Sequence, residues 1–198
     1  MVLANFNSNI SLAKERGKNM KFKTSILDEN AVKRTTVRLA HEIVEKNRGA
    51  ENLALIGIKS GGIPLAQRLA DKIYEIEGVN LPVGRIDVTL YRDDLSTFSK
   101  IPTFNDTMVD FDVNGKTIVL CDDVIFTGRT TRAAIDALLK IGRPKNIQLA
   151  IMVDRGHREL PIRPDFVGKN LPTSLSEVVC VKFTEVDGVT AVDLYEKE

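Results

Sequence analysis

Two adjacent carboxylates followed by a hydroxyl- and glycine-rich turn are the residues of this chain best suited to chemistry. An apolar run from Thr117 leads into Asp122 and Asp123, and the turn that follows contains Thr127 and Gly128. Backbone N–H groups, hydroxyls and the positive end of a following helix suit a phosphate monoester. The carboxylates would repel phosphate, so their expected partners are the hydroxyls of a ribose diol or a hydrated divalent cation. The pattern predicts a site for 5-phosphorylated ribose; the plainer alternative is a solvated strand end beside a helix cap.

A second candidate anion site follows an earlier apolar run. Lys59, Ser60, Gly61 and Gly62 join this run to a helical pattern, so consecutive backbone donors lie beside a lysine. Because the carboxyl ends of parallel strands meet at one sheet edge, we expect this loop to hold a diphosphate at the other end of the same ligand. The alternative is a tight glycine turn with a solvated lysine.

Alternating strand and helix patterns predict the elements that position these loops. Strands are expected at 53–58, 85–91, 117–121 and 147–153, and helices at 63–76 and 129–141. An earlier helix has Asp28 as its N-cap and Gly49 after its end. This succession predicts an α/β fold with a mostly parallel, twisted sheet and helices on both faces. Two short strands are expected at 178–183 and 191–195, and the long polar stretch 93–114 is expected to be a lid.

Composition narrows the classes of protein that fit. The 198 residues suit one domain, which we place at 25–198, after a flexible extension at 1–24; Met1 and Met20 are alternative starts. The sequence contains 28 Lys and Arg residues and 27 Asp and Glu residues, so its overall charge does not predict nucleic-acid binding. No apolar run has the roughly 20 residues that span a bilayer, and no secretory signal precedes the domain, so a cytoplasmic protein without membrane contact is expected. Cys121 and Cys180 are expected to be structural thiols.

The turn after the two aspartates resembles the phosphoribosyl diphosphate (PRPP) motif of type I phosphoribosyltransferases. Further stretches resemble the pyrimidine operon attenuation (PyrR) family, whose members are also uracil phosphoribosyltransferases. These stretches are 26–29, 39–42, 86–94, 153–163 and 168–170, and the likeness covers about 25–196. It implies the type I phosphoribosyltransferase fold with a small hood region. No phosphate-binding loop of the Gly-x4-Gly-Lys type and no Gly-x-Gly-x-x-Gly fingerprint is present, so kinases and dinucleotide enzymes are disfavoured.

The resemblance implies transfer of ribose 5-phosphate from PRPP to N1 of uracil, giving UMP and diphosphate, with Mg²⁺ carried by PRPP rather than by protein side chains. It implies as catalytic residues Asp122 and Asp123, which hold the ribose hydroxyls, and Arg92, which contacts the leaving group. It places Arg155 and Val178 by the base. The residues that would bind PRPP are Ser60, Gly61, Asp122, Asp123, Val124, Ile125, Phe126, Thr127, Gly128, Arg129, Thr130 and Thr131.

The resemblance also implies a regulatory role: messenger-leader RNA would bind a homodimer or higher oligomer in response to UMP or UTP and attenuate transcription. Its RNA-binding residues would be Arg38, His41, Arg158, Arg163 and Lys169. Arg34, Arg38 and His41 share one helix face, which could equally be an ordinary solvated face. A salvage enzyme without RNA regulation, and an orotate or purine transferase, remain alternatives. Two departures from the family pattern are Val37, in place of a threonine, and Gly61, in place of an arginine, which predicts weaker diphosphate binding.

Overall fold

A five-stranded parallel sheet forms the centre of the molecule, which is described by a computed structural model covering residues 20–88 and 107–198. The strand order is β3-β2-β4-β5-β6. The strands are β2 (Leu53–Ile58), β3 (Val83–Ile86), β4 (Thr117–Ile125), β5 (Asn146–Asp154) and β6 (Phe166–Asn170). All six residues of β2 are buried, as expected for a strand covered on both faces. The predicted mostly parallel α/β fold is confirmed.

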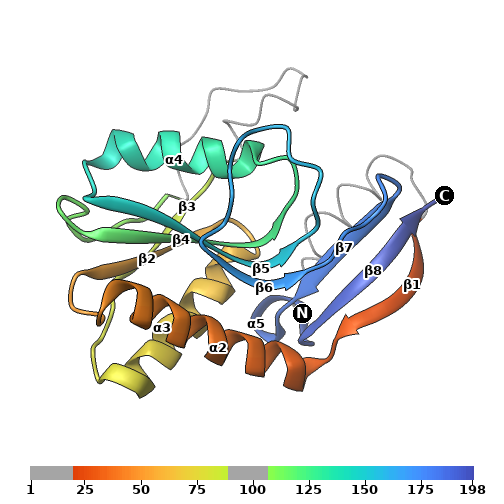
Figure 1. Cartoon of the computed structure of the whole chain (residues 1–198), viewed down its shortest axis with the longest axis horizontal. Coiled ribbons are helices and arrows are strands. Elements are labelled where there is room, and N and C mark those ends of the chain that lie inside the picture. Colours follow the sequence, from red (N-terminus) through yellow and green to blue (C-terminus); the bar gives the residue numbers. More distant parts are fainter. Residues whose placement is uncertain (1–19, 89–106) are drawn as a thin grey trace, which may run out of the picture.

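Helices cover both faces of this sheet (Figure 1). Helices α2 (Glu29–Asn47) and α3 (Gly62–Glu77) lie on one face, and α4 (Arg129–Ile141) lies on the other. The predicted N-cap is present, because the Asp28 carboxylate accepts a hydrogen bond of 2.7 Å from the amide of Ala31. Two apolar clusters fill the space between the layers, one under α2 and α3 and the other under α4. Both clusters contain residues of β2 and β4, the strands that lead into the two candidate loops.

A three-stranded antiparallel sheet, called the hood sheet here, lies at one end of the central sheet (Figure 1). Its order is β1-β8-β7, formed by β1 (Met20–Leu27), β8 (Ala191–Lys197) and β7 (Glu177–Lys182), with the short helix α5 (Thr184–Asp187) between β7 and β8. Among the residues that the structure describes, no helix is both long and apolar enough to cross a membrane.

Several predicted boundaries need correction. Residues 20–24 belong to β1, paired with β8, so the extension predicted at 1–24 ends too late; residues 1–19 lie outside the described residues. Strand β4 continues through Asp122 and Asp123, which therefore stand on a strand and not after it. Strand β6 was not predicted, and β3 ends at Ile86. Most of the predicted lid, 93–106, lies outside the described residues, and Met108 pairs with Arg85.

Candidate active site

The two predicted loops meet directly at the carboxyl edge of the central sheet. The loop after β2 lies against β4 so closely that a Cβ atom added at Gly61 would overlap the carboxylate of Asp123. A Cβ added at Gly62 would overlap the carbonyl oxygen of Cys121. Glycine at both positions permits this approach. The loop predicted to hold diphosphate and the carboxylates predicted to hold ribose are therefore neighbours.

Both carboxylates are held by backbone amides. Asp122 is 6% exposed, and its carboxylate accepts a hydrogen bond of 3.0 Å from the amide of Asp123. The Asp123 carboxylate accepts one of 2.8 Å from the amide of Val124. Burial raises the pKa of Asp123, although the hydrogen bond from the Val124 amide favours its charged form. The pair presents oriented acceptor oxygens, which can hold the two hydroxyls of a ribose.

The turn between β4 and α4 has the geometry expected of a phosphate loop. Gly128 has φ +91°, in the left-handed region that favours glycine, and the Thr127 hydroxyl accepts from the amide of Arg129. Helix α4 begins at Arg129, so its first amides and its dipole face the turn. Two predicted PRPP contacts, Ile125 and Thr131, have buried side chains that are 2% exposed.

The segment after β5, residues 155–163, clasps this turn and is called the clasp segment here. The amides of Glu159 and Leu160 both donate to the carbonyl of Thr127, at 3.0 and 3.2 Å. The Arg158 guanidinium donates to the carbonyl of Phe126 at 2.8 Å. These bonds from the clasp segment use carbonyls of the turn and none of its amides. The sequence indicated the segment only by resemblance, because nothing local shows what it contacts.

Arg155 and Phe126 form a stacked pair beside the same turn. The Arg155 guanidinium lies 4.2 Å from the centre of the Phe126 ring and is 6% exposed. It donates to the Thr173 hydroxyl and to the Ser174 carbonyl, just before β7. Burial lowers the pKa of Arg155 from its high ordinary value. Strand β7 begins at Glu177 and carries Val178. These hydrogen bonds therefore connect Arg155 to the segment that leads to Val178, and both of these residues were predicted to lie by the base.

The residues predicted to bind RNA differ in how far their cations are already used. Arg158 bonds Asp154, the Ile162 carbonyl and the Phe126 carbonyl, so its guanidinium serves the clasp. Arg38 donates to the carbonyls of Val167 and Gly168 on β6. The remaining three, His41, Arg163 and Lys169, are exposed.

Other predicted features stand as follows. Arg92 lies outside the described residues. Among the residues described, no group of three or more His, Cys, Asp or Glu side chains is placed to hold a metal ion. The Asp122–Asp123 pair can instead meet a cation that arrives with a diphosphate. Sequence reasoning missed the ion pair of 3.0 Å between Lys59 and Asp87, which joins the residues that follow β2 and β3.

Comparisons with known proteins match most of this chain and its fold. The family model described as phosphoribosyl transferase domain matches residues 23–184. A "Bifunctional protein PyrR" of Acetivibrio thermocellus is 59% identical over 176 residues, covering 89% of this chain and 96% of that protein. Another "Bifunctional protein PyrR", of Deinococcus radiodurans, is 56% identical over 176 residues, which again cover 89% of this chain and 96% of that protein. A solved hypoxanthine phosphoribosyltransferase of Staphylococcus aureus has a TM-score of 0.66 and 17% identity, covering 87% of this chain and 92% of that one. That structural likeness shows the fold.

Proposed function

Because the chain belongs to the phosphoribosyl transferase domain family and, within it, to the bifunctional PyrR proteins, we propose that it is a uracil phosphoribosyltransferase that also regulates pyrimidine genes through messenger RNA. In the transfer, the bond between C1 of the ribose and the diphosphate oxygen breaks, and diphosphate leaves with the electron pair. A bond from N1 of uracil to C1 forms, and the N1 proton is released. The products are UMP and diphosphate.

The observation that best supports transferase activity is the close approach of the two loops at Gly61 and Asp123. One ligand spanning them would place its diphosphate on the loop at 59–62, its ribose hydroxyls on the carboxylates and its 5-phosphate on the turn 126–131. Departure of diphosphate leaves positive charge on the ribose ring, so catalysis rests on alignment and on charge stabilisation. No protein nucleophile is required.

The chain's own groups divide this work. Lys59 and the amides of its loop face the leaving group, and the carboxylates of Asp122 and Asp123 orient the ribose. Mg²⁺, bound with PRPP, supplies positive charge that neutralises the departing diphosphate. The stacked Arg155 and Phe126 form one wall on the base side of the turn. Arg92 is proposed to contact the diphosphate, as the resemblance implies.

The regulatory half of the proposal is binding of the messenger leader in response to UMP or UTP. It is supported by exposed cations at Arg163 and Lys169, neither of which forms an ion pair with any residue that the structure describes. The proposal places the chain in the cytoplasm, where PRPP, uracil and messenger RNA are found, and as a homodimer or higher oligomer. The alternative is the salvage activity alone.

The transferase is tested by incubating the purified chain with PRPP, Mg²⁺ and one base at a time, followed by chromatography of the nucleotide formed. We expect UMP from uracil, and little product from orotate or hypoxanthine. A preferred base other than uracil would replace the proposal with another transferase. Omission of Mg²⁺, with a chelator present, should remove the activity.

A further inference from the structure

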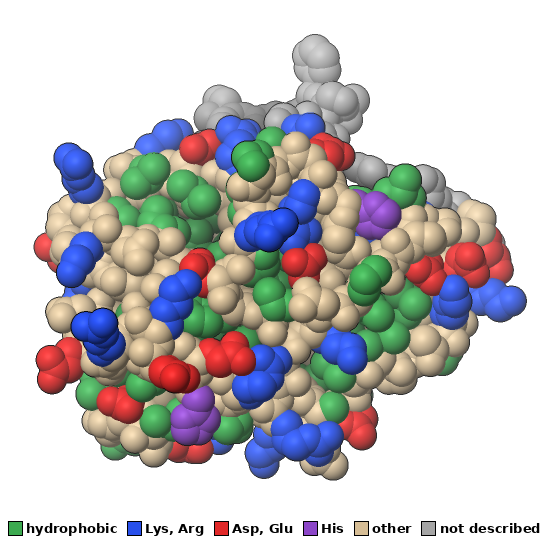
Figure 2. Space-filling view, in the orientation of Figure 1, with side chains coloured by type: hydrophobic (Ala, Val, Ile, Leu, Met, Phe, Trp, Pro, Cys, Tyr) green, Lys and Arg blue, Asp and Glu red, His purple; other side chains and the backbone are tan. Residues whose placement is uncertain are grey.

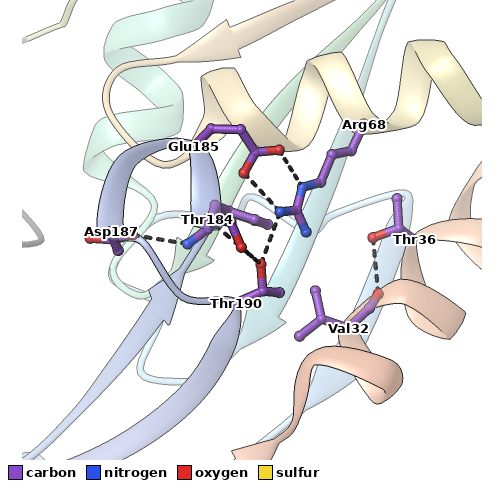
Figure 3. A network of polar contacts seen from close by, with 8 residues as sticks. Val32, Thr36, Arg68, Thr184, Glu185, Asp187 and Thr190 are labelled. Atoms are coloured by element: carbon purple, nitrogen blue, oxygen red, sulfur yellow. Dashed lines mark hydrogen bonds and ion pairs between the residues drawn. The ribbon is translucent and has the colours of Figure 1, made fainter.

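Arg68 joins the helix that begins at the diphosphate loop to the hood sheet. It lies on α3, and its guanidinium makes two hydrogen bonds to the Glu185 carboxylate, of 2.8 and 2.7 Å (Figure 3). It also donates to the hydroxyl of Thr190 at 2.9 Å. A guanidinium that meets a carboxylate with two parallel bonds fixes orientation as well as distance. One side chain of α3 therefore holds two points of the connection between β7 and β8.

That connection, residues 183–190, is called the hood turn here, and it is internally bonded. The Asp187 carboxylate accepts from the amide of Phe183, and the hydroxyls of Thr184 and Thr190 lie 2.8 Å apart. The Arg68 guanidinium lies 4.9 Å from the centre of the Phe183 ring, whose residue is 1% exposed. Because these internal bonds hold the shape of the hood turn, the bonds from Arg68 position the turn as a whole.

The hood turn is connected to the candidate site through the packing of its neighbouring strand. Strand β7, which leads into it, packs against β4, which carries both carboxylates. Burial is the main cause of the raised pKa of Asp123, and the negative charge of Asp187 adds to it. Helix α3, which carries Arg68, begins at Gly62. An added Cβ at Gly62 would overlap the Cys121 carbonyl on β4, so the start of α3 also lies against this strand. A shift between α3 and the hood turn would therefore change the space in which PRPP binds.

We propose that Arg68 is a positioning residue for the transferase reaction, holding the hood turn against α3 and so setting the closure of the hood over the PRPP site. The proposal rests on the proposed function. It requires that PRPP affinity depend on the bonds between Arg68 and Glu185, although neither residue touches the substrate.

The test is steady-state kinetics of Arg68→Gln, with PRPP and uracil varied separately. We expect KM for PRPP to rise about 5-fold or more, with kcat changed less than about 2-fold, because loss of binding that is equal in the ground and transition states raises KM and leaves kcat unchanged. Arg68→Lys keeps the charge and one bond, so it should restore part of the PRPP affinity. Glu185→Gln should raise KM for PRPP, and the double variant should be no worse than Arg68→Gln alone.

Lys72→Gln is the matched control, because it breaks the Lys72–Glu75 pair on the same helix without touching the hood. An unchanged KM for PRPP in folded Arg68→Gln overturns the proposal, as does an equal rise in the control. If Arg68→Gln does not fold, Glu185→Gln decides by the same criterion. A wild-type chain that forms no UMP contradicts the proposed function itself, and the role of Arg68 falls with it.

Discussion

At the residue scale, the two buried carboxylates of β4 make the sharpest prediction. Asp122→Asn and Asp123→Asn each keep the side-chain size but remove a charged acceptor that would hold a ribose hydroxyl. We expect each to lower kcat/KM for UMP formation by about 100-fold or more, the effect of removing one oriented polar group that stabilises a transition state. Asp136→Asn, on the surface of α4, is the control. Unchanged activity in both site variants would refute the assignment of the carboxylates.

Gly61 makes a second prediction, which the structure modifies. Replacing it by arginine would add the missing cation, but its Cβ would also displace the Asp123 carboxylate, with which it would overlap. Gly61→Ala adds the Cβ alone. We expect KM for PRPP to rise in Gly61→Ala and to be lower in Gly61→Arg than in Gly61→Ala, so that the pair separates steric cost from charge. Equal KM values in the two variants would mean that a cation at this position does not assist diphosphate binding.

The candidate loops could be predicted from sequence because each is one local stretch with a mechanism of its own. The contacts of the Arg158 side chain could not be predicted in this way, because the Phe126 carbonyl that accepts its hydrogen bond is 32 positions away. The sequence shows only that the residue is a cation. RNA binding by Arg158 stays a prediction; what the fold adds is that its guanidinium bonds the turn. Charge can be seen in a sequence, but the partner that a charged side chain meets is set by tertiary structure.

At the element scale, prediction followed the strength of the local pattern. Strand Leu53–Ile58 and helix Arg129–Ile141 were predicted to the residue, because one is a continuous apolar run and the other begins after a glycine with strong amphipathic spacing. Strand β1 was missed because most of its residues are exposed, so no alternation marks it; pairing with the distant β8 forms it. Strand β4 runs past its apolar part because β5 supplies partners as far as Asp154.

The hood sheet gives a prediction at this scale, based on pH. Lys23 on β1 reaches over to Glu177 at the start of β7, at 2.5 Å. The hydrogen bond from Lys23, followed by that from the Ser174 amide, holds the pKa of Glu177 below its ordinary value of 4.5. A lowered pKa in the folded state means stability that is present above the unfolded pKa and disappears as pH falls through the folded value.

We therefore expect the Tm of the wild-type chain to fall more steeply than that of Glu177→Gln as the pH is lowered below about 4.5. Thermal melts at a series of pH values measure this difference, and Glu75→Gln, on an exposed part of α3, serves as the control. Parallel curves for the wild type and Glu177→Gln would show that this ion pair does not link hood stability to pH.

At the scale of the whole molecule, charge is balanced and mixed. Figure 2 shows Lys and Arg side chains spread over one face with Asp and Glu among them, in keeping with the net charge of +1. A general attraction to nucleic acid is therefore weak, and RNA affinity must come from a few placed cations. Of the predicted set, Arg163 and Lys169 are exposed and unpaired among the described residues, whereas Arg38 and Arg158 already bond carbonyls.

The double variant Arg163→Gln/Lys169→Gln tests this on the whole protein. We expect weaker binding to RNA from the leader of the chain's own pyrimidine genes, and a slope of log affinity against log salt reduced by about 0.7 for each phosphate that the variant no longer neutralises. UMP formation should be unchanged, because neither side chain bonds the turn or the carboxylates. Lys72→Gln/Lys145→Gln removes the same charge elsewhere and should leave affinity and slope nearly intact. If both double variants weaken binding equally, the RNA binding is nonspecific, and the salvage activity alone is the better account of the chain.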